Sequence, residues 1–218
     1  SGSGSSSSIC RCPGVEGDGF MLVLAADTSL PILSVALVND GALAGALALE
    51  GRGSRNEKLL PAIDWLLTEH GVDRRTLDLL AVTRGPGSFT RVRIGLGTMQ
   101  GLALAIGRPV CAMSTHEAVA FGEPGQVAIV DDAGRGESYV SYFDDGRETR
   151  APHLGVAPED RRVIRLADVM QRGNVALGCA RRAIEIVARG EGDQYRDVTP
   201  IYVRLAEAEV KLLQKQNG

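Results

Sequence analysis

The sequence has few of the side chains that build metal and hydrolytic sites. Its three histidines, His70, His116 and His153, are widely separated, and no two stand four residues apart. The chain therefore cannot place a pair of His ligands on one turn of a helix, as zinc peptidases do. We expect no metal site, and a metallopeptidase is the least favoured function.

Other absences narrow the function further. No Gly-x-x-x-x-Gly-Lys-Ser/Thr segment occurs, which excludes a P-loop nucleotide site. The apolar runs fall short of the ~20 residues that a membrane helix needs, so we expect no membrane association. The net charge is −3, so contact with RNA must come from a local patch or from a partner.

The first 20 residues, SGSGSSSSICRCPGVEGDGF, are of low complexity and lack the apolar centre of a signal peptide. We interpret residues 1–20 as a disordered linker or an added tail. Cys10 and Cys12 lie in this tail, with no nearby His or second Cys pair to complete a zinc site. Cys111 and Cys179 lie in apolar segments and are expected to be reduced core thiols, which fits a cytoplasmic protein.

What is present is an alternation of strand and helix patterns. The dipeptide Asp40-Gly41 between two apolar runs predicts a hairpin. Ser114 and Glu117 form a capping box that predicts the start of a short helix. In the first half we expect strands over 21–29, 33–38, 42–50, 77–85 and 110–113, and helices over 55–70 and 88–106.

The second half continues this alternation. We expect strands over 126–133, 137–143 and 174–179, and helices over 166–172, 179–189 and 205–216. The order of elements predicts an α/β fold, with residues 21–122 as a first lobe and residues 123–218 as a smaller second lobe that ends in a helix.

The segment GPGSFTRVRIGLGTMQGLALAIG (85–107) has helical spacing but carries three glycines within it. Gly95, Gly97 and Gly101 each cost a helix about 1 kcal/mol relative to Ala. They permit close approach of another backbone, either of the parent sheet or of another subunit. Ser88 is placed to cap this helix after the Gly-Pro-Gly turn.

The preceding helix, over 55–70, favours close approach to another subunit. On a helical wheel, Trp65 points away from the apolar stripe, and Trp is enriched at interface hot spots, although it could also lie under a loop. We therefore predict that helices 55–70 and 88–106 form a subunit interface. The candidate contacts are Leu59, Ile63, Trp65, Met99, Ala103, Gly97 and Gly101.

Two segments are placed to face an anion. Asp27-Thr28-Ser29 ends the first strand, and Gly85-Pro86-Gly87-Ser88 precedes a helix N-terminus, whose free N–H groups suit phosphate. The alternative is a plain helix start that needs no ligand. No His stands near Ser88 in the sequence, so we expect no catalytic triad. The candidate anion or nucleotide contacts are Asp27, Thr28, Ser29, Gly85, Gly87 and Ser88.

Several segments resemble the TsaB family, also called YeaZ. They are LAADTS, RNEKLLPAIDWLL, the glycine-rich segment above, MSTHEAVA, DAGRGESY and PIYVR. The resemblance runs from about Met21 to Arg204 and implies an actin-like/Hsp70-like ATPase (ASKHA) fold of two lobes, the second one reduced. It further implies a protein without independent catalysis, because family members support the related enzyme TsaD.

The resemblance also implies a function and partners. Family members assist TsaD in threonylcarbamoyl transfer to the adenosine next to the anticodon of tRNA, with the ATPase TsaE as a third component. Their first-lobe helices form a bundle with TsaD or with a second copy. We therefore expect TsaD and TsaE as partners, a homodimer in isolation, tRNA contact through the complex, and no cofactor beyond weak ATP or ADP binding.

The sequence departs from the family pattern at two places. Arg55-Asn56-Glu57 stands where His-Ser-Glu is usual, and Arg91 replaces a Gly. Arg84, Arg91 and Arg93 gather around the helix start, where they could meet phosphate, an acidic partner surface or only solvent. The alternative function is a stand-alone ATPase or phosphotransferase of the actin-like fold.

Overall fold

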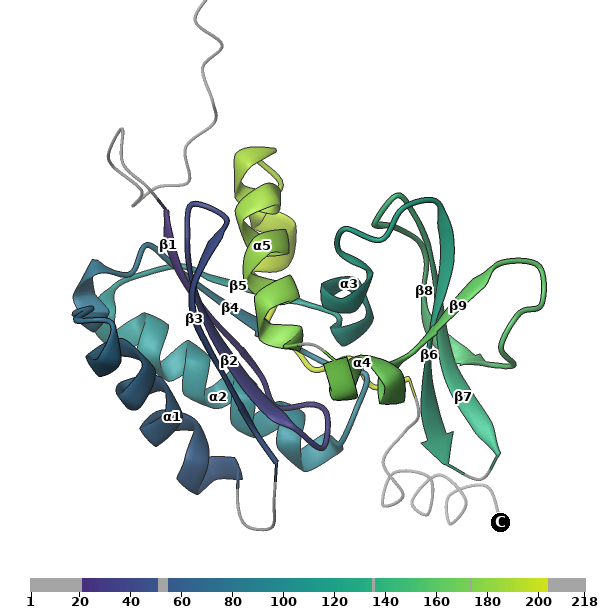
Figure 1. The fold of residues 1–218 in the computed structure, drawn as a ribbon, viewed down its shortest axis with the longest axis horizontal. Coiled ribbons are helices and arrows are strands. Elements are labelled where there is room, and N and C mark those ends of the chain that lie inside the picture. Colours follow the sequence, from purple (N-terminus) through teal and green to yellow (C-terminus); the bar gives the residue numbers. More distant parts are fainter. Residues whose placement is uncertain (1–20, 51–54, 135, 173, 204–218) are drawn as a thin grey trace, which may run out of the picture.

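A computed structural model of the chain describes residues 21–203 except 51–54, 135 and 173. Two β-sheets lie side by side, with helices between them and on the far side of the first sheet (Figure 1). The first sheet contains β1 (Leu22–Asp27), β2 (Leu33–Asn39), β3 (Ala42–Leu49), β4 (Leu79–Thr83) and β5 (Val110–Met113). The second contains β6 (Gln126–Gly134), β7 (Glu137–Asp144), β8 (Arg147–Gly155) and β9 (Arg162–Arg165).

The first sheet has the strand order β3-β2-β1-β4-β5. Strand β2 runs antiparallel to both of its neighbours, whereas β1, β4 and β5 are parallel. This is the arrangement of the actin-like/Hsp70-like ATPase fold, so the predicted fold class is confirmed. The predicted hairpin between β2 and β3 is also confirmed, because Asp40 and Gly41 have φ values of 48° and 79°, as a two-residue turn of this kind requires.

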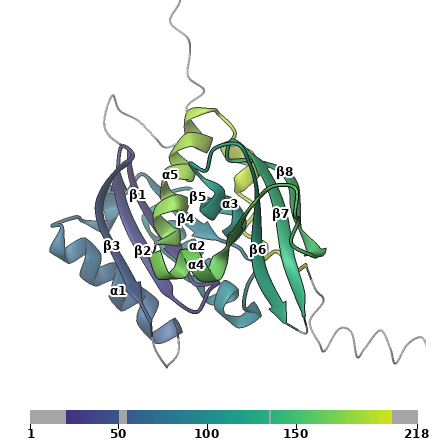
Figure 2. The ribbon, with the colours of Figure 1, turned by 45° about the vertical axis from the view of Figure 1, so that its right-hand side comes forward.

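Helices cover both faces of the first sheet (Figure 2). Helices α1 (Arg55–Glu69) and α2 (Phe89–Ile106) pack on one face, and α5 (Val175–Ala188) packs on the other. Successive residues of β1 serve the two sides in turn, since Leu24 joins the α1/α2 core and Val23 joins the α5 core. Helix α5 thus lies on the first sheet although its sequence position falls in the predicted second lobe. The exact lobe boundaries stay a prediction.

The predicted strand over 174–179 is wrong, because these residues form the start of α5. The Asn174 side chain caps this helix by accepting a hydrogen bond from the Leu177 N–H at 3.1 Å. The buried positions Val175, Cys179 and Ala183 recur at helical spacing, but the first six residues are too short a window to separate a helix from a strand. The predicted helix over 205–216 lies outside the described residues.

The second sheet has the order β8-β7-β6-β9, with β9 parallel to β6. Strands β8 and β9 were not predicted, since their sequences are rich in Arg and other polar residues. Helix α4 (Leu166–Arg172), which follows β9, confirms the predicted helix over 166–172. Val127, Ile129 and Phe143 extend the core on the α5 side of the first sheet, so one hydrophobic cluster joins the two sheets.

Helix α3 (Thr115–Ala120) connects the sheets and is held to α5 by a buried ion pair. Ser114 caps α3 by accepting from the Glu117 N–H at 2.9 Å, as predicted. The Glu117 side chain does not complete the capping box. It instead accepts hydrogen bonds from Arg182 Nε at 2.9 Å and from the Tyr195 hydroxyl at 2.7 Å. Arg182 also pairs with Glu185 at 2.9 Å, so a buried network fixes α3, α5 and the 3-10 turn Gly192–Tyr195 together.

Candidate functional site

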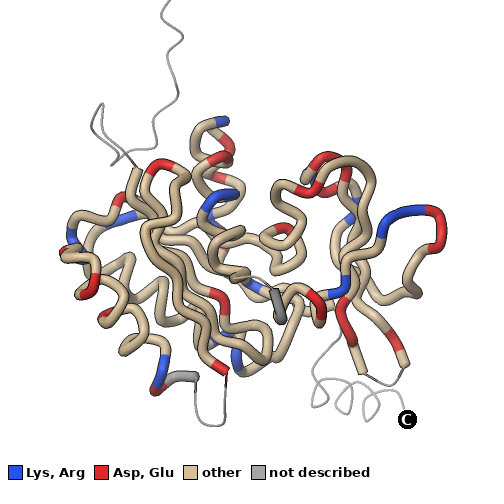
Figure 3. Tube along the Cα trace, in the orientation of Figure 1, with Lys and Arg blue, Asp and Glu red and all other residues tan. Residues whose placement is uncertain are grey.

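Helices α1 and α2 have a solvent side that faces away from the sheet, and this two-helix surface is the candidate site (Figure 1). Helix α2 begins after the Gly85–Ser88 turn and ends before Gly107, whose φ of 67° lets the chain leave the helix. The charged residues of α2 are Arg91 and Arg93, so charge is confined to its first turns (Figure 3). The remainder of its surface is apolar or small.

Four of the predicted contact residues lie on the inner side of these helices. Leu59, Ile63, Met99 and Ala103 are buried between α1, α2 and the sheet, with at most 4% of each exposed. Their prediction as partner contacts is wrong. The spacing of apolar residues marks a buried face of a helix, and here that face is buried by the chain's own core.

Other apolar side chains stand on the solvent side. Trp65 is 53% exposed, which confirms that it points away from the core. Leu60 in α1 and Leu104 in α2 are also exposed, the latter by 85%, and neither was among the predicted contacts. Trp is enriched at interface hot spots, so the exposed Trp65 is the member of this group that best fits an interaction surface.

The three glycines of α2 have different environments. A Cβ atom at Gly95 would overlap Oγ1 of Thr28, so this glycine lets the helix pack on the end of β1. A Cβ atom at Gly97 or Gly101 would meet nothing within 4 Å. Packing on the parent sheet therefore explains Gly95 only. No contact within the described part of the chain requires glycine at 97 or 101.

A cluster of two aromatic rings and one cation stands at the start of this surface. The rings of Phe89 in α2 and Tyr202 near the C-terminal end stack with centroids 4.9 Å apart. The Arg93 guanidinium lies 3.8 Å from the Phe89 ring centroid, and its Nε donates to the Tyr202 hydroxyl at 2.8 Å. Sequence reasoning could not find this cluster, because 109 residues separate Arg93 from Tyr202.

The predicted anion contacts at the end of β1 are closed off from solvent. Asp27, Thr28 and Ser29 are at most 1% exposed. Asp27 Oδ1 accepts hydrogen bonds from the Ser29 hydroxyl at 2.6 Å and from the Thr83 hydroxyl, and Ser29 Oγ lies 2.9 Å from Thr115 Oγ1. Burial raises the pKa of Asp27, against the lowering effect of these hydrogen bonds. This cluster links β1, β4 and α3 and offers no open surface to a nucleotide in this structure, so contact of these three residues with an anion or nucleotide stays a prediction.

The Gly85–Ser88 turn packs directly on Ser29, two residues after the end of β1. Gly85 and Gly87 have positive φ values of 93° and 155°, and a Cβ atom at Gly87 would lie 2.7 Å from the Ser29 carbonyl oxygen. The Ser88 N–H donates to that same carbonyl at 3.1 Å. Ser88 occupies the N-cap position of α2, but its side chain makes no capping hydrogen bond, so the predicted side-chain cap is wrong. Backbone packing accounts for this turn without an anion.

Two titratable groups outside α1 and α2 have shifted pKa values, and one of them is buried while the other is partly buried. His116 in α3 is fully buried, its Nδ1 is hydrogen-bonded to the Ser141 hydroxyl, and burial lowers its pKa to about 3. Burial, helped by the charge of neighbouring Asp132, raises the pKa of Asp131 in β6 to about 6. Within the described residues, no three His, Cys, Asp or Glu side chains gather as metal ligands would.

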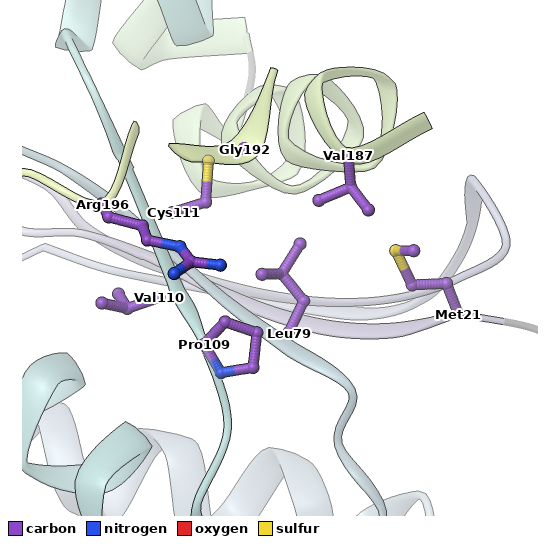
Figure 4. Close-up of a pocket in the computed structure, with 8 residues that line it drawn as sticks. All are labelled: Met21, Leu79, Pro109, Val110, Cys111, Val187, Gly192 and Arg196. Carbon is purple, nitrogen blue, oxygen red and sulfur yellow. The ribbon is translucent and has the colours of Figure 1, made fainter. Parts of the chain in front are cut away.

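A small cavity lies at the edge of the first sheet, between β4, β5 and the end of α5 (Figure 4). Its volume is about 20 Å³, which is room for a single water molecule. Its lining is mostly apolar and includes Cys111, which is buried and free, as is Cys179.

Among the described residues, no helix is both long enough and apolar enough to cross a membrane.

The chain is similar in sequence to proteins of tRNA modification. The family model described as TsaD, tRNA N6-adenosine threonylcarbamoyltransferase, matches residues 53–185. The chain is 40% identical over 143 residues to the tRNA threonylcarbamoyladenosine biosynthesis protein TsaB of Escherichia coli K12, an alignment that covers 60% of this chain and 62% of that protein. It is 28% identical to the TsaB protein of Bacillus subtilis 168, covering 90% of this chain and all of that one. The chain thus spans less than two thirds of the E. coli relative but the whole of the B. subtilis relative.

Solved structures show the same likeness. The structure described as YeaZ from Pseudomonas aeruginosa is 30% identical in sequence and superposes with a TM-score of 0.65, covering 84% of this chain and 99% of that one. A second structure, described as a protein with similarity to peptidase YEAZ from the same organism, is 29% identical and gives a TM-score of 0.68 over 84% of this chain.

Proposed function

The chain belongs to the TsaB/YeaZ family, and on that premise we propose that it is a non-catalytic subunit of tRNA threonylcarbamoyladenosine biosynthesis. In this proposal it binds TsaD through the two-helix surface of α1 and α2. TsaE joins the pair, and tRNA is reached through the complex in the cytoplasm. In isolation, two copies pair through the same surface.

Gly97 and Gly101 are the observation that carries this proposal. Each weakens α2 by about 1 kcal/mol relative to Ala. No contact among the described residues explains either glycine. A helix with two such residues on its solvent side can bring its backbone close to a helix of a second protein. The exposed Leu104 on the same helix and Trp65 on α1 offer apolar contact area.

The alternative of a stand-alone ATPase is less well supported. Asp27, the residue best placed by sequence to face a metal-bound phosphate, is buried and already accepts hydrogen bonds from Ser29 and Thr83. Its environment serves the packing of β1. A direct test is ATP hydrolysis by the purified chain alone: turnover that Asp27→Ala abolishes would overturn the subunit proposal.

The subunit proposal is tested by matched surface variants. Leu104 and Val156 are exposed by 85% and 87%, and Val156 stands after β8 in the second sheet, away from α1 and α2. Leu104→Glu and Val156→Glu should both leave the melting temperature nearly unchanged, because neither side chain is buried. Leu104→Glu should prevent association with purified TsaD and reduce tRNA modification by the reconstituted proteins, and Val156→Glu should do neither. Equal activity and TsaD binding in both variants would contradict the proposal.

A further inference from the structure

The cluster of Phe89, Arg93 and Tyr202 continues the two-helix surface at its N-terminal end. Phe89, Arg93, Gly97 and Gly101 follow one another at intervals of four residues, so they lie along one side of α2. Tyr202 comes from the C-terminal segment (residues 197–203) and contacts Phe89 and Arg93 in the first two turns of α2. The surface that a partner would meet is therefore built from α1, α2 and this later segment.

The C-terminal segment is fixed in place by hydrogen bonds with the backbone and side chain of Arg84. The Ile201 N–H donates to the Arg84 carbonyl at 2.8 Å. Arg84 Nη1 in turn donates to Asp197 Oδ2 at 3.1 Å and to the Thr199 carbonyl at 3.3 Å. These bonds hold Tyr202 where its ring can stack on Phe89. The aromatic pair is thus anchored independently of Arg93.

Arg93 is held in place by Phe89 and Tyr202 but forms no ion pair with a carboxylate of the described residues. Its guanidinium lies over Phe89, and Nε is used by Tyr202. Among the described residues, no Asp or Glu forms an ion pair with it, in contrast to Arg74, Arg84, Arg162 and Arg182. Its two Nη groups find no hydrogen-bond acceptor in the described part of the chain. A guanidinium fixed in this way is prepared to bind a carboxylate through two parallel hydrogen bonds.

When a partner covers this surface, the Arg93 guanidinium is removed from water and needs an opposite charge. Removing a cation from water without an opposite charge is strongly unfavourable, and a carboxylate that pairs with it offsets much of that penalty. Helix α2 itself contains no Asp or Glu that could serve. We infer that the protein bound at the two-helix surface presents an Asp or Glu side chain to Arg93, and that Phe89 and Tyr202 position Arg93 to receive it. This inference rests on the proposed function.

Binding to the TsaD protein of the same organism tests the inference, with three variants compared. Arg93→Gln removes the charge, Tyr202→Phe removes only the hydroxyl that orients Arg93, and Arg147→Gln removes an exposed charge from β8 as the control. Arg93→Gln should weaken binding by about thirtyfold or more, as is usual when one member of a buried charge pair is lost. Tyr202→Phe should weaken it less, and Arg147→Gln should leave it unchanged, all three with nearly wild-type melting temperatures.

Salt dependence provides a readout that a purely structural role of Arg93 would not change. Wild-type binding should weaken as ionic strength rises, and Arg93→Gln should show a shallower dependence. Unchanged affinity of Arg93→Gln, with wild-type binding intact, would overturn this inference while leaving the proposed function standing. Absence of wild-type binding would instead overturn the proposed function. If Arg93→Gln bound the protein normally but reduced the affinity of the complex for tRNA, Arg93 would serve a phosphate and the inference would be wrong.

Discussion

Gly178 in α5 lies against Ala118 in α3 so closely that a Cβ atom at position 178 would overlap the Ala118 carbonyl oxygen. This approach brings α5, which packs on the first sheet, into direct backbone contact with α3, which connects the sheets. The obstructing atom belongs to the backbone and cannot rotate away. The position therefore tolerates only glycine at this helix separation.

Gly178→Ala should destabilise the protein by about 3 kcal/mol, near the upper end of the usual cost of overpacking. Helix propensity alone would predict the opposite sign, since Ala is favoured over Gly by about 1 kcal/mol. Urea unfolding of the variant measures the change. A gain in stability would mean that α3 and α5 can separate at little cost.

Gly97→Ala and Gly95→Ala should have opposite effects on the stability of the isolated chain. Alanine at 97 enters open space and should stabilise the helix by about 0.5–1 kcal/mol. Alanine at 95 would displace the Thr28 side chain, whose hydroxyl donates to the Arg91 carbonyl at 2.6 Å, and should destabilise by about 1–3 kcal/mol. If close helix packing explains Gly97, Gly97→Ala should also reduce TsaD binding despite its higher melting temperature. Tighter binding would show that Gly97 has no such role.

Arg182→Ala should be far more damaging than Arg189→Ala, although both arginines pair with Glu185. Loss of Arg182 leaves the buried Glu117 carboxylate without its partner, which typically costs about 3–5 kcal/mol. Arg189 is partly exposed and forms an i,i+4 pair, whose loss costs at most about 1 kcal/mol. Urea unfolding of the two variants measures this, and the midpoint of Arg182→Ala should lie well below that of Arg189→Ala. Similar midpoints would contradict a dominant role for the buried pair.

Asp131→Asn should stabilise the protein more at pH 7.5 than at pH 4.5. Burial raises the pKa of Asp131 in the folded chain to about 6, so the folded state holds a proton that the unfolded state releases near pH 4. The contribution of Asp131 is fully present below pH 4 and is lost as the pH rises through 6. Asparagine lacks this dependence. Thermal melts of both proteins at the two pH values measure it, and an equal difference at both would contradict the shifted pKa.

His116 should remain neutral in the folded protein down to at least pH 5. Burial lowers its pKa to about 3, whereas the unfolded chain protonates it near pH 6.5, so His116 opposes folding increasingly as the pH falls below 6.5. This sign is opposite to that of Asp131. A titration of the His116 ring resonances by NMR tests it directly. A midpoint near 6 would show that water reaches the ring.

Local features were predictable where a short segment determines its own conformation. Asp40-Gly41 forms the expected turn, and the 3.6-residue spacing places α1 and α2 almost to the residue. The start of α5 was mistaken for a strand, because Val175-Ala176-Leu177 is apolar at every position, and only Asn174 marked a helix start.

The site was less predictable than the fold, since it depends on which side of a helix the rest of the chain covers. The apolar stripe containing Leu59 and Met99 looked like a partner contact but serves the core. The lone Trp65 was correctly placed outside it. The α2 glycines could serve packing on the parent sheet or contact with another subunit. Only the structure separates these explanations, because it shows which atoms a side chain at each glycine would meet. Contacts between distant segments, such as Arg93 with Tyr202, leave no local pattern to detect.

The position of Tyr202 sets the order in which a newly synthesised chain can present its partner surface. Helices α1 and α2 leave the ribosome early, but the ring that orients Arg93 follows about a hundred residues later. Helix α5, which covers the opposite face of the first sheet, also emerges late in translation. A nascent chain therefore contains α1 and α2 long before its docking surface is complete. Assembly with a partner that needs Arg93 in place must wait until synthesis has passed residue 202.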